Sequence, residues 1–531
     1  MSNRRSLHQL FNKWRTRATA SGELTPPEDP GIDRDIVNLV EHTKEVVADS
    51  CFFALVRTYS DGHPYIGQAI ANGASVIIGQ RAQIELDLPI PSDVTYIQVK
   101  DANQALAWMS AAWYDFPSDN LFVIGITGTN GKTTTAAILY EIMRAAGIET
   151  GLISTIKAVL GKQEAPTGLH VTTPAAPDLQ RYLKEMVEAG LTHCILETTS
   201  MGLALYRVAC VNFQIGGITN LTHEHIDYHR SFENYRRAKE ILFHMLAQQP
   251  QGAALFNADD PAYTHFSKIK VPIQVSYGIT RPADLRADDI RFSADQTRFK
   301  IKGANREPQL KIETSLVGRF NIYNILCAAG IGLQLGIEAE LIQKGIKQVG
   351  VISGRMERIN RGQSFLTIVD FAHTPDALAE AIAAARQMMV SQPGRIIALF
   401  GSAGRRDVEK RRLMAEVSAQ LAELTILTAE DPREESLDEI LEMMAAGCIS
   451  QGGRENETFW RVPDRGRAIY FALTLAQPED IVLICGKGHE QSMCFGTTEY
   501  PWDDRDATRA ALDQWLQGEG MVNLGLPTFN D

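Results

Sequence analysis

Apolar residues along most of the chain come in short runs, which alternate with longer segments of helical period. The runs 121–126, 193–198 and 252–257 have the length of buried strands, and the segment 321–336 has the pattern of a helix. An alternation of strands and helices is typical of βαβ units around a mainly parallel sheet. The sequence therefore predicts an α/β fold for the middle of the chain.

The C-terminal third repeats one pattern four times, an apolar strand that runs into a polar loop with Gly or Pro. These strands are expected at 365–370, 395–400, 424–429 and 480–485. Ligands of open α/β sheets bind at the carboxyl ends of the strands, so the four loops predict a binding site. With a smaller α/β region before them, the patterns predict an extension and three domains, over residues 1–30, 31–118, 119–348 and 349–531.

Composition agrees with a globular protein of several domains. The 531 residues are too many for a single core, and 44% hydrophobic with 22% charged residues is an ordinary balance. A net charge of −12 disfavours a nucleic-acid partner. Seven cysteines without a CxxC pair predict reduced thiols, and no apolar run reaches the roughly 18 residues of a membrane span. We expect a cytoplasmic protein without a signal peptide or membrane contact.

Residues 1–20 differ from the rest because they carry five basic side chains and no acidic one. A Pro-rich stretch, 25–31, follows them. An Arg-rich, acid-poor start is compatible with a transit peptide, with a surface helix, or with a first helix of the fold whose basic face is solvated. The last interpretation is favoured, because nothing else in the sequence indicates an organelle.

The strongest chemical signal is GITGTNGKT, residues 125–133, a form of the phosphate loop G-x-x-x-x-G-K-[ST]. We expect the preceding strand to end at Gly125 and a helix to begin near Lys132. Gly128 and Gly131 would let the backbone approach a phosphate, whose charge the helix N-terminus favours. The Lys132 ammonium suits the β- and γ-phosphate oxygens, and a Thr133 hydroxyl suits Mg²⁺.

Asn130 within T-G-T-N-G-K-T-T makes this loop similar to that of the Mur ligase family, which includes folylpolyglutamate synthases. The resemblance implies an enzyme that joins an amine to a carboxylate through an acyl phosphate made from ATP. The ATP-binding residues it implies in the loop are Gly128, Thr129, Asn130, Gly131, Lys132, Thr133 and Thr134.

A second cluster lies downstream of the loop, where Glu197 ends an apolar strand and His225 stands in NLTHEHIDYH. An acid at a strand end beside a phosphate loop can hold Mg²⁺, but a His-rich surface turn is an equally good explanation of His225. The resemblance extends to this segment and to Lys239 in YRRAK. It implies that Thr133 and Glu197 hold one Mg²⁺, and that Glu197, His225 and a Lys239 carbamylated by CO₂ hold another.

Further motifs extend the resemblance over nearly the whole chain. In LVGRFNIYN, SGRME and VDFAHTPD, it implies that Asn321 and Asn324 lie by the nucleotide, Arg355 by the γ-phosphate and Asp370 by the ribose. The implied architecture has three domains: a small N-terminal α/β domain, a central sheet like that of P-loop ATPases, and a Rossmann-like C-terminal domain. We expect a monomer that acts on small molecules.

Two motifs, GKGHE and EDPR, resemble family members that add meso-diaminopimelate as the third residue of the peptidoglycan stem. Arg433 offers a planar fork for the distal carboxylate, and Glu490 can pair with the ammonium group beside it. The acceptor is then a UDP-muramoyl dipeptide. The amino-acid residues implied are Arg406, Glu430, Asp431, Arg433, Gly486 and Glu490, and the acceptor residues are Thr43, Thr172, Thr173, Ser200 and Arg207.

Several positions depart from the family pattern. Glu430 and Asp431 replace Asp and Asn, and the extra acid would suit a basic amine such as lysine or ornithine. The acceptor side departs at His42, Lys44, Met201 and Leu205. A ligase for another acceptor, such as a folate, and a nucleotide-binding regulator without catalysis remain alternatives. The regulator is disfavoured because Lys132, Glu197, His225 and Lys239 are all present.

Overall fold

The structure is a computed structural model of the chain. It describes residues 4–21, 31, 33–58, 60–167, 171–303, 309–389 and 394–520. The chain divides into two compact units. The first unit comprises residues 1–127, 148–216 and 236–252, and the second comprises 128–147, 217–235 and 253–531. Both units mix helices with parallel strands, so the predicted α/β class is confirmed.

The N-terminal part of the first unit contains a parallel sheet of four strands. In spatial order they are β3 (Leu39–Val40), β4 (Ser50–Phe53), β7 (Ala74–Gly79) and β8 (Thr95–Gln98). The accompanying elements are β1 (Arg5–Ser6), β2 (Asp35–Ile36), β5 (Val56–Arg57), β6 (Ser60–Asp61), α1 (Leu7–Ser21), α2 (Ile66–Ala71) and α3 (Ala102–Trp113). Helix α3 begins at Asp101, whose carboxylate accepts hydrogen bonds from two amides of the first turn.

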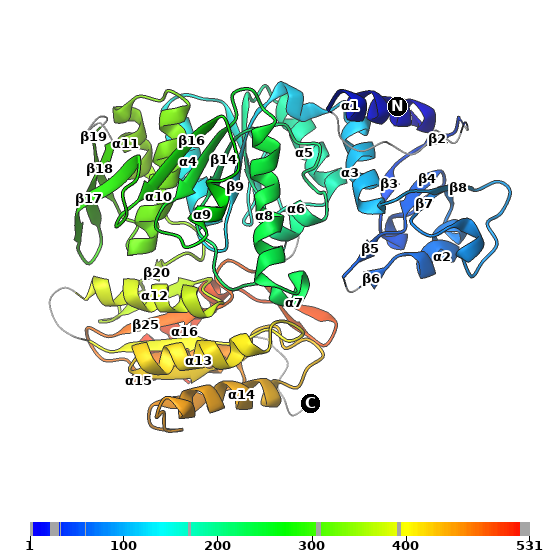
Figure 1. Cartoon of the computed structure of the whole chain (residues 1–531). Coiled ribbons are helices and arrows are strands. Elements are labelled where there is room, and N and C mark those ends of the chain that lie inside the picture. The colour runs from blue at the N-terminus through cyan, green and yellow to red at the C-terminus, as the bar shows by residue number, and fades with distance from the viewer. Residues whose placement is uncertain are drawn as a thin grey trace. The chain divides into compact units, whose positions relative to one another are not determined.

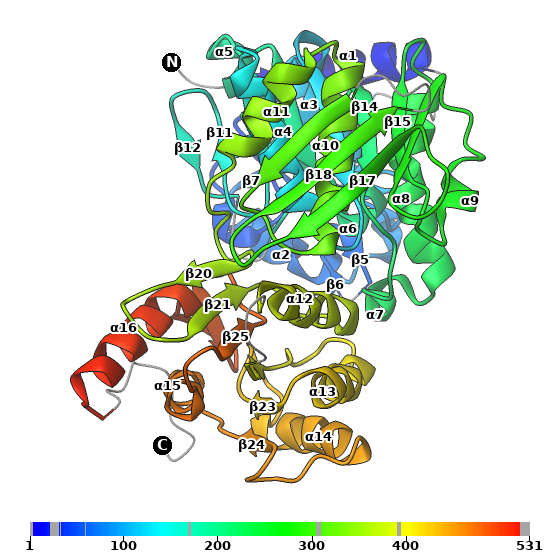
Figure 2. The ribbon, with the colours of Figure 1, turned by 90° about the vertical axis from the view of Figure 1, so that its left-hand side faces the viewer.

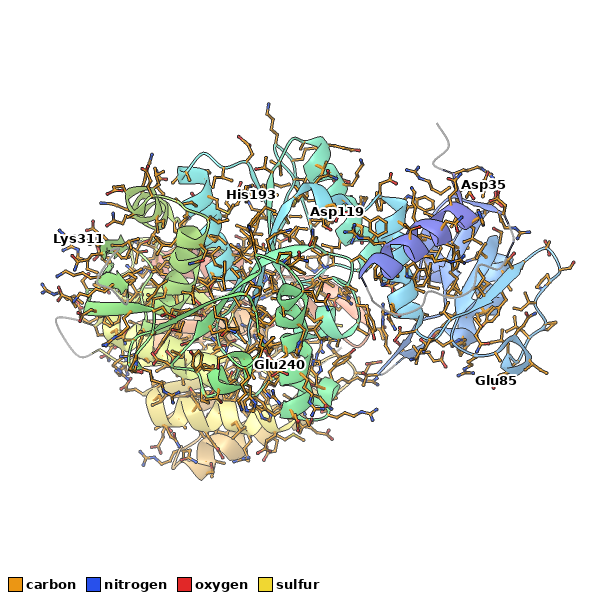
Figure 3. All side chains as sticks on the ribbon, turned by 45° about the horizontal axis from the view of Figure 1, so that its top comes forward. Asp35, Glu85, Asp119, His193, Glu240 and Lys311 are labelled. Carbon is orange, nitrogen blue, oxygen red and sulfur yellow. The ribbon has the colours of Figure 1, made fainter. Side chains whose placement is uncertain are left out.

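Helix α1 belongs to the core of this part. Leu7, Phe11 and Trp14 are buried in one cluster with residues of α3 and the sheet. Arg15 and Arg17 of this helix are exposed, and Arg17 pairs at 2.6 Å with Asp119, which Figure 3 labels. The structure thus agrees with a first helix of the fold that has a solvated basic face. The segment 22–30 lies outside the described residues.

The rest of the first unit continues with strands in the order β12 (Glu164–Ala165), β11 (Ala158–Val159), β10 (Thr150–Ile153), β13 (His193–Glu197) and β9 (Phe122–Thr127). β10, β13 and β9 are parallel. The strand expected to end at Gly125 ends two residues later, because Ile126 still pairs with Glu197. Helices α5 (Ala176–Glu188) and α6 (Ser200–Ala204) also belong to this unit, and β14 (Phe213–Ile218) and α8 (Phe232–Ala247) cross its boundary with the second unit.

The second unit holds strands β15 (Ala253–Asn257), β16 (Ile273–Gly278), β17 (Leu285–Phe292), β18 (Thr297–Gly303) and β19 (Gln309–Thr314) in that spatial order. β15, β16 and β17 run parallel to one another, β18 runs antiparallel to β17, and β19 runs antiparallel to β18. Their helices are α4 (Lys132–Ala145), α7 (Ile226–His229), α9 (Tyr263–Phe266), α10 (Arg319–Gln334) and α11 (Ala339–Gln348). The helix expected over 321–336 is α10.

A further sheet closes the second unit, with strands in the order β20 (Glu357–Ile359), β21 (Leu366–Asp370), β25 (Ile481–Cys485), β22 (Ile396–Phe400), β23 (Leu424–Leu427) and β24 (Phe459–Arg461). All but β20 are parallel, so the four predicted loops follow strand ends at one edge. The remaining elements, seen in Figures 1 and 2, are α12 (Pro375–Met388), α13 (Glu409–Leu421), α14 (Leu437–Ser450), α15 (Arg465–Leu475), β26 (Ser492–Phe495), β27 (Thr498–Pro501) and α16 (Asp504–Gln517).

Candidate functional site

The phosphate loop requires glycine at two positions. Gly128 has φ 141° and Gly131 has φ 84°, both in the region that disfavours residues with a side chain. A Cβ at Gly128 would lie 1.9 Å from Thr219 Oγ1, and one at Gly131 would lie 2.2 Å from Asn324 Oδ1. Helix α4 begins at Lys132 as expected. The loop therefore brings bare backbone to the start of a helix, which is what an anion site needs.

Neighbouring segments hold the loop by hydrogen bonds. The Asn130 amide donates to Asn220 Oδ1 at 2.9 Å, and the Thr129 hydroxyl lies 2.9 Å from the hydroxyl of Tyr235. The Lys132 ammonium group folds over the loop and donates to the carbonyls of Gly128 (3.0 Å) and Thr129 (2.8 Å). Its charge therefore lies where phosphate oxygens are expected to bind.

Helix α10 completes the wall next to the loop. Thr135 Oγ1 donates to Asn324 Oδ1 at 3.3 Å, Asn324 donates to Asn321 at 3.1 Å, and Asn321 donates to the carbonyl of Val317 at 2.8 Å. Asn321 and Asn324 are both buried. The chain of amides fixes both predicted residues against α4.

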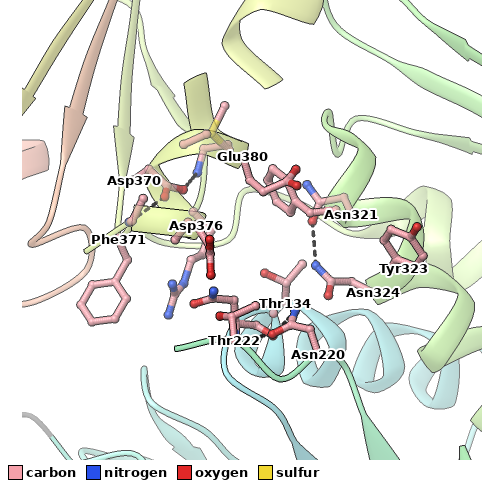
Figure 4. A pocket seen from close by; sticks show the side chains of 18 of the residues that line it. Thr134, Asn220, Thr222, Asn321, Tyr323, Asn324, Asp370, Phe371, Asp376 and Glu380 are labelled. Carbon is pink, nitrogen blue, oxygen red and sulfur yellow. Dashed lines mark hydrogen bonds between the residues drawn. The ribbon is translucent and has the colours of Figure 1, made fainter. Parts of the chain in front are cut away.

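A cavity of about 440 Å³ opens beside the loop, within the second unit (Figure 4). Seven of the predicted nucleotide residues line it: Asn130, Gly131, Thr134, Asn321, Asn324, Arg355 and Asp370. The lining also includes Asp259, Asp260, Tyr323 and Phe371, which the sequence reasoning missed. The acidic pair directly follows the end of β15, and this strand-end position was a signal that could have revealed it.

Asp370 holds backbone at the edge of this cavity. Its two carboxylate oxygens accept from the amides of Met356 (2.7 Å) and Ala372 (2.8 Å). Burial raises the pKa of Asp370, and the Arg355 charge and the two amides oppose that shift. The guanidinium of Arg355 lies 4.5 Å from the centre of the Phe371 ring, and its Nη2 lies 3.5 Å from Thr133 Oγ1.

His373 and Glu224 form a contact that the sequence reasoning did not find. The His373 ring has Nε2 2.9 Å from Glu224 Oε1 and Nδ1 2.9 Å from the carbonyl of Phe371. Burial alone raises the pKa of Glu224, but the charges of His225, His373 and Lys132 outweigh it and hold that pKa well below its usual value.

Three of the predicted acceptor residues, Thr172, Thr173 and Arg207, gather around Glu197 in the first unit. Glu197 is buried at the end of β13 and accepts from the amide and the hydroxyl of Thr155, each at 3.1 Å. The Thr155 hydroxyl also lies 3.1 Å from the hydroxyl of Thr172, Thr173 donates to the Glu197 carbonyl at 2.9 Å, and Arg207 donates to the Thr173 carbonyl at 2.7 Å. Thr155 was missed, although it follows a strand end as Glu197 does.

Three further predicted residues are described in their own surroundings. Ser200 is buried at the start of α6, whose N-cap is the Thr199 hydroxyl. Thr43 lies in a short helical turn and donates to Gln68 at 3.3 Å. Arg406 is exposed in the loop after β22.

The residues predicted to hold metal are divided between the units. Glu197 and Lys239 belong to the first unit, and Thr133 and His225 belong to the second. Their convergence stays a prediction. Among the described residues, no three His, Cys, Asp or Glu side chains form a metal site, but the predicted set contains only two residues of these types.

At the carboxyl edge of the last sheet, the GKGHE loop (486–490) and the EDPR loop (430–433) contact each other through Lys487. Its ammonium group is fully buried and lies 2.8 Å from Asp431 Oδ1 and 2.6 Å from Glu490 Oε2. Burial lowers the pKa of Lys487, and the two carboxylates outweigh that effect and raise it. Asp431 also accepts from the amide of Cys494 at 3.0 Å. The charge of Asp431 is therefore compensated inside the protein.

The same edge contains buried polar atoms without a hydrogen-bond partner. Within the described part of the chain they include Ser402 Oγ, Glu430 Oε2, Arg433 Nε and His489 Nδ1. A buried polar atom without a hydrogen bond destabilises the folded protein unless a ligand or a water molecule supplies the missing bond. Burial raises the pKa of Glu430, and it lowers the pKa of His489 to about 3 with the help of the nearby Arg355 charge.

Comparison with known proteins identifies the family. The model described as the Mur ligase middle domain matches residues 126–332, and the model described as Mur ligase, glutamate ligase domain matches 354–488. A UDP-N-acetylmuramyl-tripeptide synthetase of Roseiflexus sp. (strain RS-1) is 36% identical over 500 residues, which cover 92% of this chain and 96% of that protein. The chain belongs to the Mur ligase family.

Relatives with a second name support the same placement. A UDP-N-acetylmuramoyl-L-alanyl-D-glutamate--2,6-diaminopimelate ligase of Geobacillus kaustophilus (strain HTA426) is 37% identical over 489 residues, 91% of this chain and 96% of that one. A solved ligase of the same name has a TM-score of 0.61 and 27% identity, covering 92% of this chain and 98% of that one. The resemblance to the Mur ligases and their architecture is confirmed. The exact domain boundaries stay a prediction.

This Mur ligase shows one further feature. Within the described ranges, no helix is both long and apolar enough to cross a membrane.

Proposed function

We propose that this Mur ligase uses ATP to join a diamino acid, meso-diaminopimelate, to the terminal carboxylate of UDP-N-acetylmuramoyl-L-alanyl-D-glutamate. The products are the amide, ADP and phosphate, and the step belongs to peptidoglycan precursor synthesis. We further propose that the chain acts as a monomer on these small molecules, without a nucleic-acid partner.

One observation carries the proposal. The unit that contains the phosphate loop and its cavity also contains a sheet edge where buried polar atoms lack a hydrogen-bond partner. A nucleotide alone would use the first feature, but a ligase needs a second site for the amine. The names of the relatives identify the reaction that uses both sites.

The chemistry begins with transfer of the γ-phosphoryl group of ATP to the acceptor carboxylate. Lys132 and the amides at the start of α4 stabilise the charge on the transferred group. The free amine then attacks the acyl phosphate carbon and releases phosphate. Thr133 and Glu197 carry the hard oxygen ligands that Mg²⁺ prefers, and a bound Mg²⁺ would neutralise phosphate charge.

Lys239 is the least usual member of the proposed metal set. Its side chain is only 1% exposed. A buried ammonium group is costly, and an unmodified one would repel a cation. Carbamylation by CO₂ removes that positive charge and supplies carboxylate-like oxygens, so we propose that Lys239 is carbamylated and holds Mg²⁺ together with Glu197 and His225.

The contacts of Asp431 bear on the choice of amino acid. Asp431 and Arg433 are two residues apart, and an acid that neutralised Arg433 would favour lysine as the substrate. Instead Asp431 pairs with Lys487, and Arg433 has no ion pair among the described residues. The Arg433 guanidinium is thus available for the distal carboxylate of diaminopimelate, a group that lysine and ornithine lack.

On the acceptor side, we propose that Thr172, Thr173, Ser200 and Arg207 contact the muramoyl dipeptide and that Thr43 contacts its nucleotide. Support comes from the hydrogen bonds that join Thr172, Thr173 and Arg207 around Glu197. Arg207 brings a cation to an anionic substrate.

The proposal is tested by measuring ADP and phosphate release with purified protein, ATP and Mg²⁺. Release should require both the muramoyl dipeptide and the amino acid, and the amide should appear by mass spectrometry. ATP turnover that needs neither substrate would contradict the ligase reaction. Turnover with a folate acceptor in place of the muramoyl dipeptide would favour the alternative acceptor.

A further inference from the structure

The turn at residues 353–357 carries Arg355 and has an unusual backbone. Gly354 (φ 62°) and Met356 (φ 47°), on either side of Arg355, both lie in the left-handed region. That conformation is costly for a residue such as methionine, so surrounding contacts must hold it. A Cβ at Gly354 would also lie 2.2 Å from the amide nitrogen of His489. The GKGHE loop therefore presses directly on this turn.

Two carboxylates hold the backbone of the turn. Glu357 Oε2 accepts from the Gly354 amide at 3.0 Å, and Asp370 Oδ2 accepts from the Met356 amide at 2.7 Å. These bonds lie just before and just after Arg355. They fix the backbone from which its guanidinium extends over Phe371 toward Thr133.

Helix α16 holds the turn from the other side. Arg509 Nη2 donates to Glu357 Oε1 at 3.0 Å, and Arg505 donates to the hydroxyl of Ser353. Glu357 is 8% exposed, so Arg509 compensates a nearly buried charge. Figure 2 shows α16 beside β20, the strand that begins at Glu357.

The helix itself is firmly anchored. At its first residue, the Asp504 carboxylate forms two hydrogen bonds of 2.7 Å with Arg465, and both side chains are fully buried. A buried bidentate pair of this kind resists displacement, because separating the partners leaves two uncompensated charges. Arg505 and Arg509 thus extend from a fixed support.

We propose that Arg505 and Arg509 are positioning residues that aim Arg355 at the γ-phosphate of ATP. The inference rests on the proposed function and on the position by that phosphate which the family resemblance implies for Arg355. Without Arg509, the Glu357 carboxylate loses its counter-charge and no longer holds the Gly354 amide firmly. The strained turn then relaxes, and Arg355 leaves its place above Phe371.

The test compares the affinity for a non-hydrolysable ATP analogue with the affinity for ADP, because only the analogue has a γ-phosphate. Arg509→Met and Ser353→Ala should each lower the ratio of the two affinities, Arg509→Met by about tenfold, as expected for loss of a charge-assisted bond. ADP binding should not change. Arg509→Lys, which keeps the charge beside Glu357, should restore most of the ratio.

Asp513→Asn is the matched control, because it breaks another ion pair of α16, that of Asp513 with Arg361 at 2.7 Å, away from the turn. It should keep the ratio of the wild type. The proposal is overturned if the wild type does not distinguish the two nucleotides, if both test variants keep its ratio, or if Asp513→Asn lowers the ratio equally. An equal loss of ADP and analogue binding also overturns it.

Thermal melting of each variant excludes misfolding, and Ser353→Ala serves if Arg509→Met does not fold. The proposed function fails by a different result. In that case the wild type binds the analogue more tightly than ADP but makes no amide from the muramoyl dipeptide and an amino acid.

Discussion

The phosphate loop belongs to the same unit as the carboxyl edge of the last sheet, where we propose that the amino acid binds. The two regions differ in whether their buried polar groups have hydrogen-bond partners. Around the loop, Asn130 and Asn324 are completed by protein partners. At the edge, Glu430 and His489 retain buried atoms with no partner in the described structure. The loop itself is thus held by protein partners, and the atoms left for a ligand to complete lie at the edge and, as Thr222 Oγ1, in the cavity beside the loop. Substitutions in the loop should therefore abolish catalysis, and those at the edge should change which amino acid is used.

The largest effect is expected for Lys132→Ala. The variant loses the cation that stabilises the transferred phosphoryl group, and kcat should fall by roughly 10³-fold. Steady-state ADP release measures the loss. Lys184→Ala, which removes a surface lysine paired with Glu188 at 3.5 Å, is the control and should retain full activity. A Lys132→Ala enzyme with normal kcat would contradict the assignment of the loop.

Lys239→Ala should reduce activity by about 10²-fold, because the carboxylate-like oxygens of the carbamate are lost. Acetate or formate in the assay should restore part of the rate. Lys132→Ala is the control for rescue, since an acid cannot replace its ammonium group. Normal activity of Lys239→Ala in the absence of any added acid would contradict carbamylation.

Arg433→Ala tests the proposed amino-acid site at the carboxyl edge of the last sheet. Loss of a charge-assisted contact to the distal carboxylate should raise KM for meso-diaminopimelate by about 10- to 100-fold, with a smaller effect on kcat. The preference for diaminopimelate over lysine should fall with it. An unchanged preference would remove Arg433 from the amino-acid site.

Asp431→Asn is the matched control for Arg433→Ala, since it changes a neighbouring charge that pairs with Lys487 and not with Arg433. It should lower the free energy of unfolding by about 1.5–3 kcal/mol, the range for a hydrogen bond to a charged group, and leave the amino-acid preference intact. A changed preference between diaminopimelate and lysine would show that Asp431 contacts the substrate.

The smallest effect concerns pH. The pKa of His489 is about 3 in the folded protein, below the ordinary value of 6.5, because burial and Arg355 disfavour its charged form. Between these two values the unfolded chain binds a proton that the folded chain does not, so this residue makes stability fall as the pH falls through that window. In urea unfolding at a series of pH values, His489→Gln should show a shallower fall than the wild type. An identical slope would contradict the burial of a neutral ring.

Local sequence motifs predicted most of the structure of the phosphate loop and of the helix that follows it. The glycines, Lys132 and the start of α4 lie within a few residues of each other, so their arrangement depends on short-range geometry. The same holds for three of the four strand ends of the last sheet, and β23 ends at Leu427, two residues before the expected end. The end of β9 was wrong by two residues, because pairing with Glu197 extends it, and that partner lies 71 residues away along the chain.

Three contacts that the sequence did not reveal join distant segments. Thr155 with Glu197, His373 with Glu224, and Lys487 with Asp431 are separated by 42, 149 and 56 positions. No periodicity or motif indicates which acid a given lysine or histidine will meet. Asp431 is an example. Its position two residues before Arg433 suggested that it would neutralise the Arg433 charge, but in the fold it pairs with Lys487.

The most direct test of the account is a screen of amino acids with wild-type protein, ATP, Mg²⁺ and UDP-N-acetylmuramoyl-L-alanyl-D-glutamate, with the amide product measured by mass spectrometry. Rapid product formation is expected with meso-diaminopimelate and little with L-lysine or L-ornithine, because only diaminopimelate has a second, distal carboxylate for Arg433. Efficient use of lysine with no reaction of diaminopimelate would contradict it.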